Sequence, residues 1–354
     1  MKINTRTVGA VWILTIALGL NAASPTLPVR GLHVMAPKPD EMDLALRFIR
    51  EALPKEGVNT LVMEFDYRYQ FTRRPEVTDA DALSKDDVKK IVAVCRDAGV
   101  RLIPQINCLG HQSWAGNTAG LLRAHPELDE TPGKYPQNAG IYCRSYCPLH
   151  PKVHEIVFDL IDELAEADAF HAGMDEIFLP GEEDCERCKG KNKAELFAGE
   201  VKALRDHLAQ SGRTMWIWDD RFLDGATTGM GKWEASMNGT QDAIRMIPKD
   251  VVICDWHYDR ALPSINYFAM EGFPVVACSW RKPNVALGQF AMVRDTRAHA
   301  TGEIGDRMNG VLQTTWVAFG PFAKAYFGEQ TGDTEVHEAV QTFRALFEEL
   351  RVMQ

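Results

Sequence analysis

Residues 251–278 read VVICDWHYDRALPSINYFAMEGFPVVAC, which is an apolar run, an amphipathic stretch and a second apolar run. The runs at 251–256 and 274–280 predict two strands, and 262–271 predicts a helix between them. Strands that are apolar at nearly every position are buried on both faces, as in parallel sheets. The stretch therefore predicts a strand–helix–strand unit of the α/β class.

The same unit recurs along the whole chain. Predicted strands cover 30–36, 58–65, 100–107, 169–175, 214–219, 251–256, 274–280 and 310–316. Predicted helices cover 39–53, 85–98, 151–167, 194–211, 241–247, 262–271, 286–300 and 322–351. Eight such units in about 330 residues predict an eight-stranded parallel (β/α)8 TIM barrel, with an open doubly wound sheet as the alternative. No G-x-G-x-x-G motif follows a strand, so a nucleotide site is not supported.

The N-terminus differs in kind from the rest of the chain. Lys2 and Arg6 precede an uncharged, largely apolar stretch over 7–20, and the small residues 22–24 follow. This order is typical of a signal peptide, predicted here over 1–23 and followed by one (β/α)8 domain over 24–354. The protein is then exported, periplasmic or secreted, and has no stable membrane span after cleavage. An uncleaved membrane anchor is the alternative.

The composition and charge of the chain indicate which kinds of molecule it is expected to bind. The chain has 354 residues, of which 45% are hydrophobic and 25% charged, as in an ordinary globular protein. Its net charge is −10, and it has no long run of Lys or Arg. A nucleic-acid partner is therefore not expected.

Four of the eight cysteines form two closely spaced pairs that flank the predicted strand 169–175. They are Cys143 and Cys147 in a C-x3-C motif, and Cys185 and Cys188 in a C-x2-C motif. Such spacing suits a closed structural zinc site, whereas export favours disulfides, and unlinked thiols are a third reading. The other four cysteines lie singly in apolar segments and are expected to be buried hydrophobes.

Phe170-His171-Ala172-Gly173-Met174-Asp175-Glu176 places two adjacent carboxylates at the end of a predicted strand. Alternation along the strand would put His171, Gly173 and Asp175 on one face, where Gly173 leaves room beside the acid. A carboxylate pair can divide the work of acid/base chemistry on a sugar. The alternative is a surface dipeptide beside a histidine of the core.

The other predicted strand ends carry polar and aromatic residues. In a TIM barrel the functional groups lie at the carboxyl ends of the strands. Each of the last four predicted strands ends with a tryptophan: Trp218, Trp256, Trp280 and Trp316. Indoles stack on the apolar faces of sugar rings, while carboxylates and histidines bind the hydroxyls. The rim therefore predicts a site for a glycan or glycoconjugate.

The segment from His171 to Glu176 resembles the H-x-G-G-D-E motif of glycoside hydrolase family 20, the β-N-acetylhexosaminidases, with Met174 in place of a glycine. Three further matches follow the family's order: Arg30-Gly31, Ile103-Pro-Gln with Gly110-His111-Gln112-Ser113, and Trp218-Asp219-Asp220. The family's closing W-x-E is absent, because Val317 and Ala318 follow Trp316. Tyr258 and Asp259 are candidates to replace a tyrosine and an aspartate that the family carries on strand seven.

The resemblance implies a retaining glycosidase that releases a terminal β-linked N-acetylhexosamine with help from the substrate's own acetamido oxygen. Asp175 would orient the acetamide and Glu176 would act as general acid and base. No cofactor is expected for catalysis, and the cysteine spacing separately leaves a structural zinc as one reading. Predicted substrate-binding residues are Arg30, His111, His171, Trp218, Asp219, Trp256, Tyr258, Trp280 and Trp316. The alternatives are a different 2-acetamido sugar, endo action, or a catalytically silent carbohydrate-binding barrel.

Overall fold

The computed structural model describes residues 27–352, and the predicted signal peptide over 1–23 lies outside this range. Its centre is a closed barrel in the order β1-β10-β9-β8-β7-β6-β3-β2, with every neighbouring pair parallel. The strands are β1 (Val29–Met35), β2 (Thr60–Glu64), β3 (Arg101–Cys108), β6 (Ala169–Gly173), β7 (Thr214–Trp218), β8 (Val252–Trp256), β9 (Val275–Ser279) and β10 (Met308–Gln313). The predicted (β/α)8 barrel is confirmed, and the open sheet is wrong because β1 pairs with both β10 and β2.

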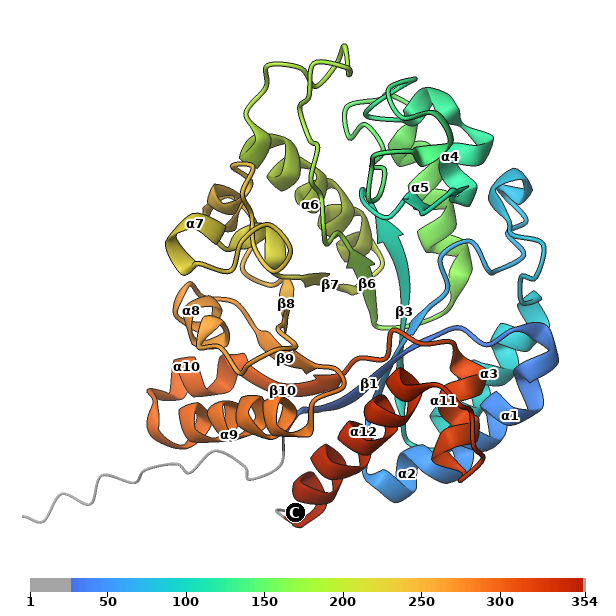
Figure 1. Ribbon diagram of the computed structural model, residues 1–354, viewed down its shortest axis with the longest axis vertical. Helices are drawn as coiled ribbons and strands as arrows, with labels where there is room; N and C mark the ends of the chain where they lie inside the picture. The colour runs from blue at the N-terminus through green and yellow to red at the C-terminus, as the bar shows by residue number, and fades with distance from the viewer. Residues whose placement is uncertain (1–26, 353–354) are drawn as a thin grey trace, which may run out of the picture.

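Helices ring the barrel, as Figure 1 shows. They are α1 (Met42–Arg47), α2 (Leu53–Glu56), α3 (Lys85–Asp97), α4 (Gly120–Ala124), α5 (Val153–Leu164), α6 (Lys193–Gln210), α7 (Gly225–Thr228), α8 (Ser264–Met270), α9 (Pro283–His299), α10 (Gly302–Arg307), α11 (Phe319–Tyr326) and α12 (Thr334–Val352). None of the helices within 27–352 is long and apolar enough to cross a membrane. Two short antiparallel strands, β4 (Ser113–Trp114) and β5 (Asn117–Thr118), lie in the loop after β3.

Three predicted elements need correction. The helix predicted over 322–351 is two helices, because Gly328 and Gly332 adopt left-handed φ values of 96° and 68° between α11 and α12. The helix predicted over 241–247 is a single 3-10 segment, Gln241–Arg245. The strand predicted over 169–175 ends at Gly173, where φ is +65°, so strand alternation does not place Asp175.

Two apolar layers hold the barrel together. The inner layer fills the barrel with buried side chains from all eight barrel strands, among them Val62, Ile103, Trp218 and Leu312. The outer layer lies between the sheet and the helices. In it Phe48 packs edge to face against Phe319 and Phe322, with ring centroids 5.8 and 5.9 Å apart. The packed interior closes the bottom of any cavity that opens at the carboxyl ends of the strands.

Candidate active site

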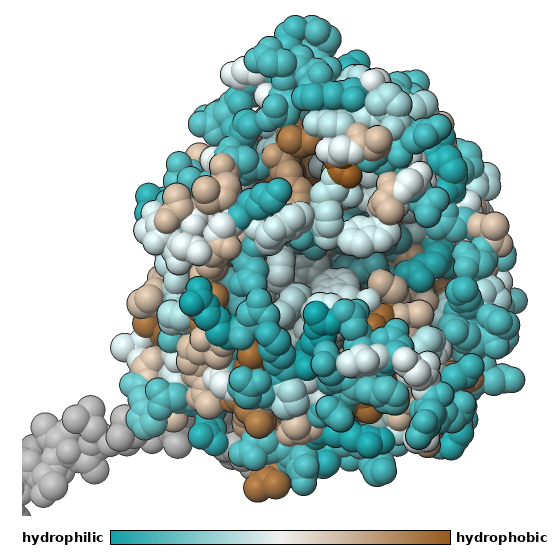
Figure 2. Space-filling model, viewed as in Figure 1, coloured by the Kyte–Doolittle hydropathy of each residue, from teal (hydrophilic) through white to brown (hydrophobic). Residues whose placement is uncertain are grey.

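A cavity of about 570 Å³ opens at the carboxyl ends of the barrel strands, and Figure 2 shows the hollow in the middle of this face. Its wall draws on every barrel strand or the loop after it except β7, and on the first turn of α12. The lining residues are Met35, Glu64, Asp66, Asn107, His111, Ser113, Trp114, Tyr142, Asp175, Glu176, Trp256, Tyr258, Trp280, Trp316 and Glu335. This is the end of the barrel where the sequence predicts the site.

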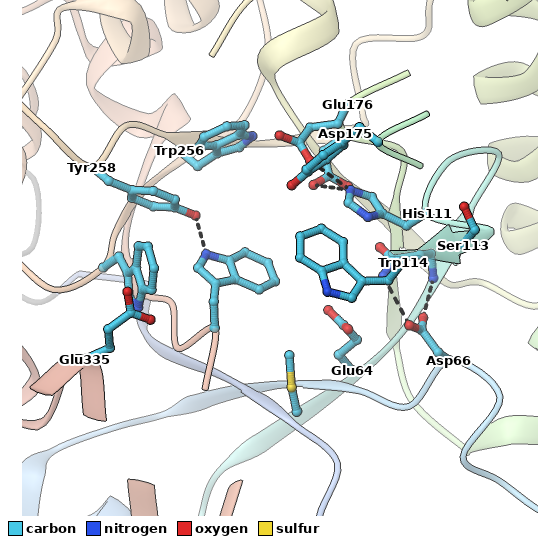
Figure 3. Close-up of a pocket in the computed structure, with 15 residues that line it drawn as sticks. Glu64, Asp66, His111, Ser113, Trp114, Asp175, Glu176, Trp256, Tyr258 and Glu335 are labelled. Carbon is cyan, nitrogen blue, oxygen red and sulfur yellow. Dashed lines mark hydrogen bonds and ion pairs between the residues drawn. The ribbon is translucent and has the colours of Figure 1, made fainter. Parts of the chain in front are cut away.

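Asp175 and Glu176 enter the cavity side by side, and His111 bridges them (Figure 3). His111 Nε2 lies 3.2 Å from Asp175 Oδ2 and 3.2 Å from Glu176 Oε2. The side chain of Asp175 is 13% exposed and that of Glu176 is 10% exposed, so both are largely buried but still reach the cavity surface. Burial opposes a charged imidazole, but the two carboxylates outweigh it and raise the pKa of His111 well above its ordinary value.

The loop after β3 is folded so that His111 points at the acids. His111 itself has a left-handed φ of +53°. Gln112 fixes this turn, because its Nε2 donates to Asn107 O and Gly110 O at 2.8 Å while Tyr67 Oη donates to Gln112 Oε1 at 2.6 Å. Gly110 allows the close approach, since a Cβ there would lie 2.8 Å from Asp175 O.

The backbone that carries the acids turns sharply away from β6. Met174 and Glu176 have φ values of +68° and +53°, which few non-glycine residues adopt. The buried Asp220 holds this turn, because Glu176 N donates to Asp220 Oδ2 at 2.9 Å. Arg221 Nε, also buried, donates to the same oxygen at 2.6 Å and neutralises the aspartate. Asp220 is thus a positioning residue for Glu176.

A second acid pair, Glu64 and Asp66, lines the cavity from the end of β2. Burial would raise the pKa of Glu64, but His33, whose Nε2 lies 3.5 Å from Glu64 Oε2, outweighs this and lowers the pKa. Burial together with the charge of Glu64 raises the pKa of Asp66 to about 7. Asp66 accepts hydrogen bonds from Asn107 N at 2.8 Å and Asn107 Nδ2 at 3.3 Å.

An aromatic wall faces the acids (Figure 3). Tyr258 stands at its centre, with ring centroids 5.1 Å from Trp256 and 5.5 Å from Trp280. Trp316 Nε1 donates to Tyr258 Oη at 2.7 Å, which fixes both rings. The indole nitrogens of Trp256 and Trp280 are buried without a partner in the described structure and remain available as donors.

Four residues predicted to bind substrate lie outside the cavity lining. Arg30 is near the amino end of β1, and its guanidinium donates to Gly57 O and Leu27 O. His171 and Trp218 are fully buried beneath the cavity, with ring centroids 4.3 Å apart. Asp219 is buried and accepts a hydrogen bond from Trp256 N at 2.9 Å, so it supports the aromatic wall from behind. The predicted His111, Trp256, Tyr258, Trp280 and Trp316 all line the cavity.

Two observations concern residues beyond the predicted site. Asp259, the expected replacement on strand six, is exposed and pairs with Lys282 at 2.6 Å. Tyr142 and Glu335 line the cavity but were not predicted, because they lie in a long loop and on the closing helix, where sequence gives no signal of proximity.

The predicted cysteine quartet is wrong in one member. All eight cysteines are free thiols. Cys143 lies near the acids, with its Sγ 3.6 Å from Glu176 O. Cys147, Cys185 and Cys188 instead meet one another around Glu130.

Comparison with known proteins identifies the family of this barrel. The model of the family described as glycosyl hydrolase family 20, catalytic domain, matches residues 59–301, more than half of the chain. The chain belongs to glycosyl hydrolase family 20. The resemblance inferred from the sequence motifs is therefore confirmed.

The curated relatives of the chain are distant. A β-hexosaminidase of Emericella nidulans is 25% identical over 232 residues, which cover 58% of this chain and 34% of that protein. β-Hexosaminidase subunit A2 of Dictyostelium discoideum is 25% identical over 219 residues, which cover 56% of this chain and 38% of that protein. The chain thus spans well under half the length of these curated relatives.

Solved structures share the fold. A β-N-acetylhexosaminidase aligns with a TM-score of 0.64 and 18% identity, covering 93% of this chain and 75% of that one. Flavobacterium johnsoniae chitobiase aligns with a TM-score of 0.60 and 17% identity, covering 92% and 52%.

Proposed function

We propose that this family 20 domain is a retaining glycosidase that releases a terminal β-linked N-acetylhexosamine, with Asp175 and Glu176 as its catalytic pair. The observation that carries the proposal is the placement of two adjacent carboxyl groups within 3.2 Å of one histidine, His111, in an aromatic-walled cavity. Hexosaminidase activity of the distant relatives supports the choice of sugar.

The geometry gives each acid a distinct task. Asp175 Oδ2 faces His111, whereas Asp175 Oδ1 is buried without a hydrogen-bond partner in the described structure. An unpaired buried acceptor is costly, and the N–H of a 2-acetamido group would satisfy it. The ionised Asp175 would then align the acetamido oxygen for attack on the anomeric carbon and stabilise the positive charge that develops.

Glu176 completes the reaction as general acid and base. It protonates the glycosidic oxygen as the bond to the anomeric carbon breaks, and later takes a proton from the water that opens the cyclic intermediate. Neither step needs a nucleophile from the protein, which is why two acids on consecutive residues suffice. Asp220, which holds the Glu176 backbone, keeps the acid in place between the two steps.

The aromatic wall would hold the sugar ring. Trp316 and Trp280 offer apolar faces, and the unpaired indole nitrogens of Trp256 and Trp280 can donate to ring hydroxyls or the acetamide carbonyl. The packed interior below, with His171 and Trp218, leaves no exit at the bottom of the barrel. A cavity closed at its base favours removal of a terminal residue over internal cleavage.

The test uses chromogenic N-acetyl-β-glucosaminide and N-acetyl-β-galactosaminide substrates. Glu176→Gln should lower kcat by at least about 10²-fold, because general acid/base help is worth about 10²–10⁴-fold. The matched control is Glu183→Gln, an exposed acid in the same loop, which should keep full activity. Unchanged activity of Glu176→Gln would remove Glu176 from the role, and binding of N-acetylglucosamine without turnover by the native protein would favour a silent binding barrel.

A larger substrate is the second candidate, favoured by an aromatic surface beside the cavity. Tyr142 contacts Trp114 at 5.1 Å and Trp233 at 4.9 Å between ring centroids. Trp114 and Trp233 are 59% and 44% exposed, so their faces are open to further sugar units. A panel of β-linked oligosaccharides of increasing length should show a lower KM for those that extend beyond the cleaved residue.

Export is part of the same proposal. The charged, apolar and small-residue order of 1–23 supports a cleaved signal peptide. Expression of the whole chain, followed by cell fractionation and N-terminal sequencing, should find the protein outside the cytoplasm and shortened near residue 23. A full-length cytoplasmic protein would contradict this.

A further inference from the structure

A second cluster of metal-ligand side chains lies away from the cavity. Glu130, Cys147, Cys185 and Cys188 are all buried, and one donor atom from each lies within 4.8 Å of the others. Cys147 Sγ is 3.4 Å from both Cys185 Sγ and Cys188 Sγ. None of the four residues lines the cavity that holds Asp175 and Glu176.

Glu130 supplies an independent sign that a ligand is expected here. Its side chain is 1% exposed, and Oε2 has no hydrogen-bond partner in the described structure. The other oxygen, Oε1, accepts a hydrogen bond from Gly181 N at 3.0 Å, which fixes the carboxylate. The thiols of Cys147, Cys185 and Cys188 all interact with this carboxyl group. A carboxylate buried among three thiols without a cation is expensive. A bound metal ion would remove that cost.

We propose that Glu130, Cys147, Cys185 and Cys188 bind a structural zinc ion. Zinc takes four tetrahedral ligands, with Zn–S distances of about 2.3 Å, which puts neighbouring sulfurs about 3.8 Å apart. The observed 3.4 Å separations need to open by only a few tenths of an ångström. Three protein thiolates and one carboxylate fill every position, so the ion is structural rather than catalytic.

Backbone hydrogen bonds hold the C-x2-C segment in a tight turn. Cys188 N donates to Cys185 O at 3.2 Å. Lys189 N donates to Cys185 O at 2.9 Å, which closes the C-x2-C turn.

A disulfide explains less of the cluster. Cys147 is equally close to two thiols, so bridging one of them leaves the other buried beside an unpaired Glu130. Zinc engages all four side chains at once. Cys143, the fourth member expected from spacing, belongs to neither arrangement because it lies against Glu176 O.

Zinc at this place would join two loops that carry the proposed chemistry. Glu130 and Cys147 lie in the loop after β3, which also presents His111, and Cys185 and Cys188 lie in the loop after β6, which begins with the acids. Cross-linking these loops would fix the distance between His111 and its carboxylates. The zinc site itself does not depend on which sugar the cavity takes.

The first experiment measures metal in the full chain, purified with a reductant and without chelator. Mass spectrometry of elements should find about one zinc per chain in the native protein, in Cys143→Ser and in Cys95→Ser, but less than a tenth of that in Cys147→Ser and Glu130→Ala. Zinc absent from the native protein after incubation with zinc salt overturns the proposal, as does zinc lost from Cys143→Ser but kept by Cys147→Ser.

A second experiment uses only the native protein, so it tests the zinc site even if the variants fail to fold. Cys147, Cys185 and Cys188 should resist alkylation until a chelator removes the metal, as followed by mass spectrometry of the labelled peptides. Metal removal should also lower Tm by about 5–10 °C, the shift expected for loss of a ligand present at about a thousand times its Kd. A disulfide between any two of the three in the intact protein overturns the proposal.

Discussion

Asp66 offers a quantitative test of the cavity's electrostatics. Its pKa of about 7 in the folded protein compares with 3.8 for an unperturbed aspartate, and the causes are burial and the neighbouring Glu64 charge. The folded state therefore holds the proton more tightly than the unfolded chain does. This contribution to stability is fully present below pH 3.8, falls as the pH rises, and is gone above about pH 7.

The magnitude follows from the size of the shift. The difference between a pKa of 3.8 and one of about 7 corresponds to a loss of about 4 kcal/mol in the free energy of unfolding as the pH rises through this interval. This value is an upper limit. Screening by water in the open cavity should reduce it to about 2 kcal/mol. Asp66→Asn cannot ionise, so its free energy of unfolding relative to the native protein should rise by about 2–4 kcal/mol between pH 4 and pH 8.

The assay is urea unfolding of the native protein and Asp66→Asn at several pH values. The amide loses one of the two hydrogen bonds with Asn107, a pH-independent cost of about 1 kcal/mol, so the slope rather than the absolute difference is the readout. Asp86→Asn, an exposed acid on α3, is the control and should follow the native protein at every pH. A constant difference between Asp66→Asn and the native protein would refute a raised pKa.

Three further substitutions probe the surroundings of the acids. Asp220→Ala leaves the buried Arg221 unpaired and should lower the free energy of unfolding by about 3–5 kcal/mol in urea titrations, with kcat also reduced. Trp233→Ala should raise KM for long β-linked oligosaccharides about 2–10-fold, the loss of one stacking contact, and leave KM for the chromogenic monosaccharide unchanged, because Trp233 lies outside the cavity lining. Gly173→Ala places a Cβ 2.2 Å from Asn107 Oδ1 at a φ of +65°, so calorimetry should find a lower Tm. An unchanged Tm would show that the turn at residue 173 accepts a side chain without strain.

The barrel could be predicted because its signals are local. Strands such as 251–256 and 274–280 are apolar at nearly every position, and the helices between them carry a clear period. The end of β6 could not be predicted, since Met174 and Glu176 adopt left-handed φ values that tertiary contacts impose rather than residue type. The break between α11 and α12 is different, because Gly328 and Gly332 are a local signal that the single helix predicted over 322–351 did not take into account.

Position at a strand end does not by itself decide which predicted residue lines the cavity, because Trp256 ends β8 and lines it while Trp218 ends β7 and does not. Trp316 lies three residues past β10 and lines the cavity, whereas Trp218 is the last residue of β7 and remains in the packed interior. Asp219, predicted to bind substrate, instead accepts a hydrogen bond from Trp256 N, while the next residue, Asp220, holds the Glu176 backbone. Glu130 was invisible to spacing rules, because only the folded loop brings a lone carboxylate to the three cysteines.

The most direct test of the acid pair is a crystal structure with an oxazoline-type mimic of the cyclised N-acetylhexosamine. We expect the mimic on the floor of the cavity, with Asp175 Oδ1 accepting a hydrogen bond from its protonated ring nitrogen and Glu176 beside the anomeric carbon. A mimic bound elsewhere, or bound with Asp175 turned away from the nitrogen, would contradict substrate-assisted catalysis by this pair.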